Sequence, residues 1–127
     1  MALSTRRRRY LSGKGQTNPR AAATMRSGGG ADLRIWVEAL DDVSMRLAPF
    51  GRAEATAMLD ELRGRALLDG GRGGPPVDRR ALAQMISGVS RWLARAPWLR
   101  ELDINPLIAT GDAFIAVDAR IRVAIPD

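Results

Sequence analysis

Polar residues interrupt an otherwise apolar stretch near the end of the chain, ELDINPL at residues 101–107. Asp103 and Asn105 alternate with apolar residues, and Asp118 occupies the same kind of position in the next stretch, AFIAVDARIRV. An amide oxygen and a carboxylate are hard ligands that suit Mg²⁺, which takes one or two protein oxygens and completes its octahedron with waters and substrate phosphates. These residue types could therefore bind a divalent cation together with a phosphate-bearing ligand.

The pairing of two strands must bring these oxygens together, and residue alternation fixes that pairing. Residues 99–109 and 113–123 each have one apolar and one polar face, and we expect both apolar faces to be buried together. A two-residue turn at Gly111-Asp112, with glycine first as in a type II′ turn, meets this demand. Directly paired residues lie about 4.5–5.5 Å apart at Cβ, so one cation could touch both members of a polar pair. The expected pairs are Ile108 with Ile115, Ile104 with Ala119, Leu102 with Ile121, Asn105 with Asp118, Asp103 with Arg120, and Glu101 with Arg122.

The same polar face also has a purely structural interpretation. Rows of opposite charge are common on the solvent face of a hairpin, and the pairs Asp103–Arg120 and Glu101–Arg122 fit that description. Each exposed pair stabilises the fold by under about 1 kcal/mol. Asn105 and Asp118 have no basic partner in this register and are harder to explain in this way. The pattern alone leaves both interpretations open.

Composition excludes several other kinds of chemistry. The chain has 127 residues, which is room for one domain, and it contains neither cysteine nor histidine. Disulfides, thiolate metal sites, thiol nucleophiles and the Ser-His-Asp arrangement are therefore excluded. No apolar run approaches the roughly 20 residues that span a bilayer, so we expect a cytoplasmic protein without a membrane partner.

Positive charge is concentrated in residues 1–30. This segment holds 7 of the 20 basic residues, including the run Arg6–Arg9, and no acid, which leaves 13 basic and 14 acidic residues in the rest of the chain. Because it is aperiodic and poor in apolar residues, we predict that residues 1–30 are a disordered basic tail and that residues 31–127 form the domain. The tail could be a phosphate-binding arm, an organelle transit peptide, or solvated chain outside any fold. The nearly neutral domain does not favour nucleic acid as its partner.

Residue periodicity predicts two helices in the middle of the chain. Apolar residues at helical spacing from position 55 predict a first helix, with Gly64 in the left-handed conformation after its last turn. A second apolar stripe from position 82 predicts a helix that Asp78 caps and Pro97 ends. The intervening LLDGGRGGPPVD is expected to be a loop, and we favour a spacer over a mobile cover for the site.

Strands flank these helices on both sides. Alternation predicts a hairpin over residues 34–48 that turns at Asp41-Asp42. Two further strands, at about 99–109 and 113–123, complete the chain. The order ββααββ predicts an α+β fold, a small antiparallel sheet with two helices on one face.

Three segments resemble a known family. They are VEALDDVSMRLAPF, LRGRALLDGGRGGPPVD and ELDINPLIATGDAFIAVDARIRV. They resemble the end of the ATP-grasp region of NDP-forming acyl-CoA ligases, which are the acetate–CoA ligase (ADP-forming) family and are related to the succinyl-CoA synthetase β subunit. The similarity covers about residues 35–125. It implies a partial ATP-grasp lobe that serves the conversion of an acid, CoA and ATP into acyl-CoA, ADP and phosphate.

The resemblance implies roles for five residues. Asn105 and Asp118 match the two Mg²⁺ ligands for the nucleotide phosphates, and Asp103 matches an acidic position near the phosphohistidine transfer site, which makes it the expected catalytic residue. Arg72, in the Gly-rich loop, and Glu38, in the strand after the family's glycine-rich turn, are the candidate nucleotide-binding residues. The implied cofactors are Mg²⁺ and ATP.

The chain also departs from the family pattern. Family members hold the nucleotide between two lobes with phosphate-binding lysines, whereas the only lysine here is Lys14 and no histidine is present to be phosphorylated. The resemblance therefore implies weak ATP binding, inactivity of the chain alone, and a partner chain or domain that supplies the missing lobe and the CoA-binding domain. The alternative is a non-catalytic interaction module whose arginine-rich tail binds nucleic acid or an acidic partner.

Overall fold

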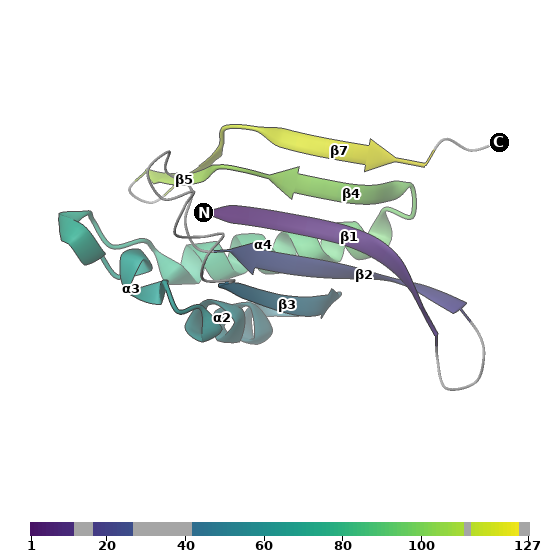
Figure 1. Cartoon of the computed structure of the whole chain (residues 1–127), viewed down its shortest axis with the longest axis horizontal. Helices are drawn as coiled ribbons and strands as arrows, with labels where there is room; N and C mark the ends of the chain where they lie inside the picture. Colours follow the sequence, from purple (N-terminus) through teal and green to yellow (C-terminus); the bar gives the residue numbers. More distant parts are fainter. Residues whose placement is uncertain (12–16, 27–41, 111–112, 125–127) are drawn as a thin grey trace.

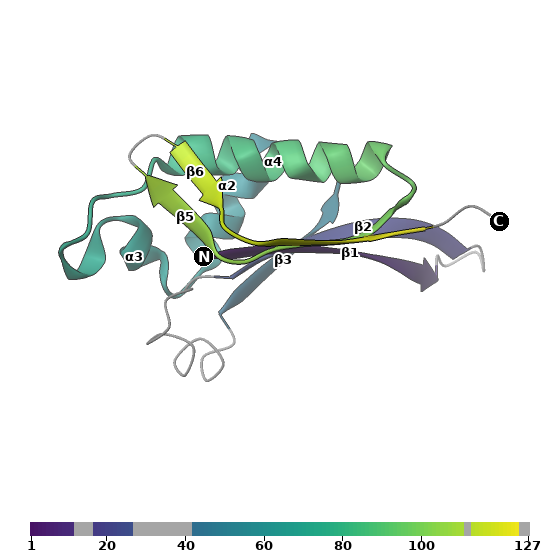
Figure 2. The ribbon, with the colours of Figure 1, turned by 90° about the horizontal axis from the view of Figure 1, so that it is seen from above.

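The computed structural model describes residues 1–11, 17–26, 42–110 and 113–124. These residues form a five-stranded antiparallel sheet, a separate two-stranded ribbon and a layer of helices on one face of the sheet (Figures 1 and 2). In the order in which they lie side by side, the strands of the sheet are β3 (Val43–Ala48), β2 (Thr17–Arg26), β1 (Ala2–Leu11), β4 (Leu99–Ile104) and β7 (Ala119–Val123). The ribbon pairs β5 (Leu107–Thr110) with β6 (Ala113–Ala116). The helical segments are α2 (Arg52–Glu61), α3 (Arg65–Leu68), the 3₁₀ turn η1 (Gly71–Gly73) and α4 (Arg79–Arg95).

The N-terminal segment belongs to the sheet, so the prediction of a disordered tail is wrong for the described part of residues 1–30. β1 pairs with β2 along its whole length and with β4 on its other side, which makes it the central strand. Leu3 is fully buried in the core, and buried Thr5 accepts a hydrogen bond at Oγ1 from the backbone N–H of Leu102 at 3.2 Å. The prediction from composition was wrong here because pairing with neighbouring strands on both edges can order a strand whatever its intrinsic preference.

The second strand of the predicted hairpin is confirmed as β3, whereas its first strand and the Asp41 end of its turn lie outside the described residues. β3 pairs with β2 and shows an unexpected division of its faces. The apolar Met45 and Leu47 are exposed, while Ser44 is buried and Arg46 forms ion pairs with Glu54 and Glu61 of α2. Polar residues of β3 therefore face the helices.

Both predicted helices are confirmed, with one correction at the end of the first. Asp78 caps α4, since its Oδ1 accepts a hydrogen bond from the N–H of Ala81 at 2.9 Å. Gly64 has φ −77° and is not left-handed. The carboxylate of Asp42 instead accepts hydrogen bonds from the N–H groups of Arg63 and Gly64, at 2.6 and 2.7 Å. A side chain thus satisfies the backbone groups that follow α2.

The predicted register of the last two strands is confirmed: five of the six expected pairs lie within paired strands, and a backbone hydrogen bond joins the sixth, Asn105 with Asp118. Each predicted strand is nevertheless broken in two. The ribbon β5–β6 turns out of the plane of the sheet toward the helix layer (Figure 2). The break changes which residues of the later segment face the core: Leu107 is buried, whereas the alternation predicted that Ile108 would be. Ile108 and Ile115 pair with each other but are 47% and 52% exposed, so their predicted burial is wrong.

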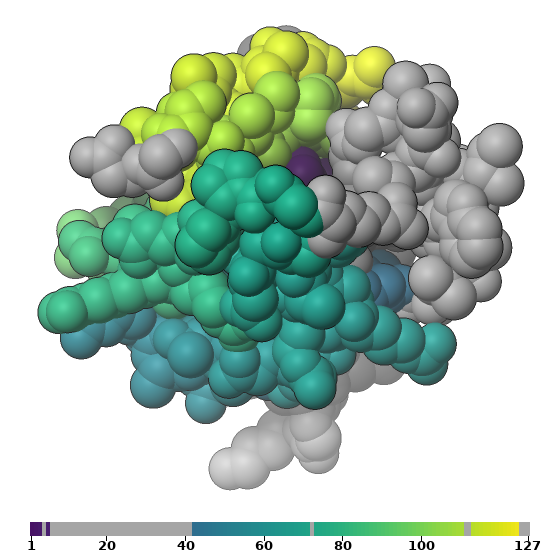
Figure 3. All heavy atoms as spheres, turned by 90° about the vertical axis from the view of Figure 1, so that its left-hand side faces the viewer, coloured from purple at the N-terminus to yellow at the C-terminus, as the bar shows by residue number. Residues whose placement is uncertain are grey.

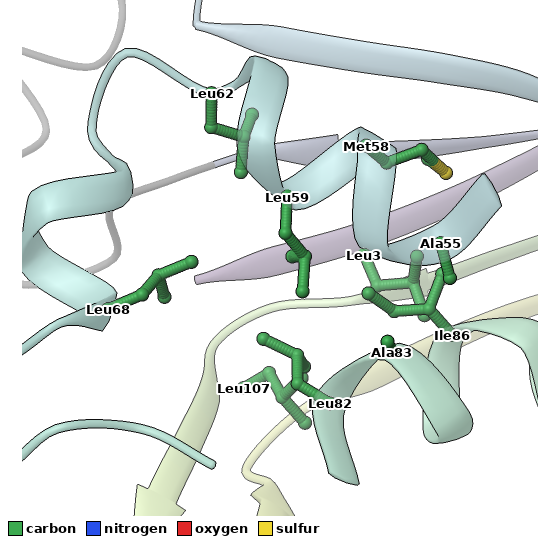
Figure 4. Packing of buried hydrophobic residues seen from close by; sticks show 10 residues of the cluster. All are labelled: Leu3, Ala55, Met58, Leu59, Leu62, Leu68, Leu82, Ala83, Ile86 and Leu107. Atoms are coloured by element: carbon green, nitrogen blue, oxygen red, sulfur yellow. The ribbon is translucent and has the colours of Figure 1, made fainter. Parts of the chain in front are cut away.

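The hydrophobic core lies between the sheet and the helices (Figure 4). α2, α4 and β1 contribute most of its fully buried side chains, and β5 adds Leu107. A second cluster joins the end of α4 to β4 through Leu93, Ala96, Leu99 and Leu102. At the edge of the sheet, Ile121 and Val123 of β7 remain 54% and 49% exposed, contrary to the prediction that the apolar face of 113–123 is buried. α4 packs against β2 and β3, which lie toward the edge of the sheet opposite to β7.

Candidate magnesium and nucleotide site

Asn105 and Asp118 lie opposite each other where the sheet passes into the ribbon. The N–H of Asn105 donates to the carbonyl of Asp118 at 3.0 Å, and the N–H of Val117 donates to the carbonyl of Pro106 at 3.0 Å. These bonds continue the β4–β7 ladder by one pair, as the register predicted. Both residues are exposed, and the Asp118 side chain is 61% accessible. The fold therefore holds an amide and a carboxylate on adjacent backbone segments at one end of the sheet.

The polar residues of β4 and β7 share the face of the sheet that is opposite to the helices, which we call the outer face. Leu102 is buried on the helix side, and successive residues of a strand point to opposite faces, so Asp103 lies on the outer face. Asp103 is half-buried and stands between Ser4 of β1 and Arg120 of β7, its direct cross-strand partners. The expected catalytic residue is thus in the middle of a row of polar groups.

Ion pairs on the outer face differ in closeness. Arg122 Nη2 lies 3.4 Å from Glu101 Oε2, as the predicted pairing required. Arg120 Nε lies 3.9 Å from Asp118 Oδ2, a contact between residues i and i+2 of the same segment that the cross-strand pairing scheme did not include. Sequence reasoning treated Asp118 as lacking a basic partner because it considered directly opposite residues only. The alternating positions 118 and 120 carry the signal that would have shown this contact.

The donor set fits Mg²⁺ held jointly with a phosphate group. Within the described residues, no three groups among His, Cys, Asp and Glu gather closely enough to form a metal cage. Mg²⁺ does not need one, because it commonly binds through one or two protein oxygens and substrate phosphates. Asn105 and Asp118, both accessible, supply that number of oxygens. A Ca²⁺-type site with six or more protein oxygens would not fit this pair.

The structure describes less of the two remaining candidates, Arg72 and Glu38. Arg72 lies in η1, between the left-handed residues Gly70 (φ 88°) and Gly73 (φ 80°). A Cβ on Gly70 would lie 2.8 Å from the carbonyl oxygen of Gly74, so this turn requires glycine. Figure 1 shows the segment α3–η1 at the end of the molecule where β5 lies, and Figure 3 views that end directly. Glu38 lies outside the described residues. The nucleotide contacts of Arg72 and Glu38 stay predictions.

No helix in the described ranges is long and apolar enough to cross a membrane.

Known proteins match this chain in both sequence and structure. The family described as the ATP-grasp domain matches residues 26–123. The β subunit of acetate–CoA ligase [ADP-forming] I from Pyrococcus furiosus is 44% identical over 87 residues, which are 68% of this chain and 38% of that protein. Acetate–CoA ligase [ADP-forming] I from Archaeoglobus fulgidus is 37% identical over 87 residues, 68% of this chain and 13% of that protein.

Solved structures extend the match to the N-terminal strands. The dinucleotide-forming acetyl-coenzyme A synthetase 1 of Ca. Korarchaeum cryptofilum, solved with coenzyme A and Mg-AMPPCP, gives a TM-score of 0.75 at 28% identity over 97% of this chain and 52% of that chain. The chain thus spans about half of that structure and much less than two thirds of the curated relatives' length. The relatives that this chain matches include ADP-forming acetate–CoA ligases, and the chain belongs to the ATP-grasp domain family.

Proposed function

We propose that this chain is a partial ATP-grasp lobe of an NDP-forming acyl-CoA ligase and that it contributes the Mg²⁺–nucleotide ligands. The reaction of the complete enzyme joins an acid to CoA and converts ATP to ADP and phosphate. In this proposal Asn105 and Asp118 hold Mg²⁺, Asp103 serves the phosphoryl transfer beside them, and Glu38 and Arg72 contact the nucleotide.

The observation that carries the proposal is the backbone pairing of Asn105 with Asp118, at 3.0 Å from N to O. It aligns an amide and a carboxylate so that one cation could reach both. A bound Mg²⁺ would neutralise charge on the nucleotide phosphates and fix their position. The relatives support the nucleotide assignment, because one solved structure of similar fold was obtained with Mg-AMPPCP and coenzyme A.

The same proposal makes the chain incomplete by itself. It spans 38% of one curated relative and 13% of another. A nucleotide on the outer face of a single sheet would stay in contact with water, which weakens the electrostatic stabilisation of the transition state. We therefore propose that another chain or domain covers the nucleotide and supplies the CoA-binding domain, and that the chain alone forms no acyl-CoA.

The metal site can be tested by NMR on the full chain. Titration of ¹⁵N-labelled protein with Mn²⁺, a paramagnetic substitute for Mg²⁺, should first broaden the amide signals of residues 103–106 and 117–120. Asp118→Asn should remove this selective broadening. The matched control is Asp69→Asn, which changes an exposed carboxylate in an ion pair with Arg79 at 3.1 Å. Broadening that follows other carboxylates and ignores Asp118 would refute the site.

The incompleteness has its own assay. Purified chain supplied with acetate or succinate, CoA, ATP and Mg²⁺ should form no acyl-CoA, and activity should appear only after addition of the partner captured with it from its host. Turnover by the chain alone would contradict the proposal. The alternative of an arginine-rich binding tail gains no support, because Arg6–Arg9 lie within β1, where all four pair with β2 and Arg6 also pairs with β4.

A further inference from the structure

We infer that Arg120 binds the phosphate oxygens of the nucleotide whose Mg²⁺ is held by Asn105 and Asp118. This inference rests on the proposed function, because it adds a cation for the same ligand at the same site. It concerns a residue to which neither the residue pattern nor the family resemblance gives a ligand. The strand register predicted from the sequence gave Arg120 only a structural role, as the cross-strand partner of Asp103.

Arg120 has the position that this role requires. It lies two residues after Asp118 on the same face of β7, and its Cα partner across the strand is Asp103. The guanidinium is therefore flanked by the proposed metal ligand and the expected catalytic carboxylate. A polyphosphate bound to a cation at Asp118 would extend over the neighbouring side chains of the outer face, where Arg120 lies two residues from Asp118 and Arg122 four.

The side chain is also free to make such a contact. Its Nε lies 3.9 Å from Asp118 Oδ2, which is too long for a hydrogen bond, and the Arg120 side chain is 84% exposed. A cation on Asp118 would offset the charge that now attracts the guanidinium. The planar fork of arginine donors matches phosphate oxygens in a bidentate arrangement.

Arg122 provides a matched control on the same strand. It has the same side chain on the same face, but its Nη2 lies 3.4 Å from Glu101, a carboxylate that is only 25% exposed. It is also two cross-strand pairs farther than Arg120 from Asn105 and Asp118. The two arginines thus differ in their partners and in their distance from the proposed metal, and not in chemistry.

The test is an NMR titration of the full chain with inorganic tripolyphosphate at saturating Mg²⁺, followed at the amides of residues 103–106 and 117–120. Arg120→Ala should raise the dissociation constant about tenfold, as expected for a lost charge-assisted hydrogen bond to phosphate. Arg122→Ala should change it by less than about threefold, the range of an exposed ion pair. Arg120→Lys should fall between the wild type and Arg120→Ala, because it keeps the charge and loses the fork.

Failure of the inference is distinguishable from failure of the proposed function. If Mn²⁺ does not broaden the wild-type signals around Asn105 and Asp118, the proposed metal site itself is refuted. If broadening is intact but Arg120→Ala and Arg122→Ala weaken tripolyphosphate equally, Arg120 has no special role and the inference is wrong. Absence of any Mg²⁺-dependent tripolyphosphate shift in the wild type would also overturn it.

Discussion

At the scale of single residues, the carboxylate of Asp42 holds the backbone that leaves α2. It is 7% exposed and accepts hydrogen bonds from the N–H groups of Arg63 and Gly64. Asp42→Ala should lower the free energy of unfolding by about 2–4 kcal/mol, because two part-buried donors lose a charged acceptor. Urea denaturation followed by circular dichroism would measure it. Asp60→Ala, which removes an exposed ion pair with Arg79, should cost under about 1 kcal/mol. Equal losses in the two variants would contradict this reading of Asp42.

Glu61 makes stability depend on pH at the same scale. Hydrogen bonds from Arg46, and then from Ser44, lower the pKa of Glu61 below its ordinary value of 4.5. A depressed folded-state pKa stabilises the protein above the unfolded-state pKa, and this contribution is lost as pH falls through the folded-state pKa. When the pH is lowered beneath about 4.5, the urea concentration at the unfolding midpoint should therefore decrease, and this decrease should be smaller in Glu61→Gln than in the wild type. An identical acid response in the two proteins would show that Glu61 carries no part of it.

At the scale of elements, α4 depends on the cap that its sequence predicted. Asp78 Oδ1 accepts from the N–H of Ala81 at 2.9 Å. Asp78→Ala should lower the free energy of unfolding by about 1 kcal/mol, and Asp78→Ser should restore most of it, since serine is an equally good cap. Chemical denaturation of the three proteins measures both changes. A serine variant as unstable as the alanine variant would point to a role of the charge instead of the cap.

The strands β4 and β7 show how far a residue pattern can predict packing. Leu102 and Ile121 are direct cross-strand partners on one face, yet Leu102 is 4% exposed and Ile121 is 54% exposed. Leu102→Ala should cost about 2–5 kcal/mol of unfolding free energy, the range for a buried leucine. Ile121→Ala should cost under about 1.5 kcal/mol, because little apolar area is buried there. Comparable losses in a denaturant titration would mean that the edge strand is covered in solution.

These elements also explain which features could be predicted from sequence. Register followed from alternation alone, because a slip by one residue would mix apolar and polar faces, and it brought Asn105 opposite Asp118. Burial did not follow, since it depends on where the helices pack. The break after Ile104 exchanges the faces of the next strand, and no period-2 pattern records such a bend. The outer-face contact of Arg120 with Asp118 was missed because it joins residues two positions apart on one segment, whereas the pairing scheme considered only residues opposite each other on two strands.

At the scale of the whole molecule, the fold depends on a segment whose composition marks it as dispensable. β1 is the central strand of the sheet, paired with β2 and β4, and Leu3 is fully buried in the main core. Removal of residues 1–26 would leave β3 without its paired strand and β4 paired only with β7, and it would open the core beneath them. Buried backbone groups without partners are costly, so the remaining chain should not keep this sheet.

A truncation experiment separates the two views of that segment. Residues 27–127 alone should give poorly dispersed amide signals and no cooperative urea transition, whereas the full chain should give both dispersion and cooperativity. Leu3→Ala in the full chain should remain folded and lose about 2–5 kcal/mol, which shows that the truncation acts through the strand and not through one side chain. A cooperatively folded 27–127 fragment would return the first 26 residues to the role of a tail and would require β3 and β4 to pair in another way.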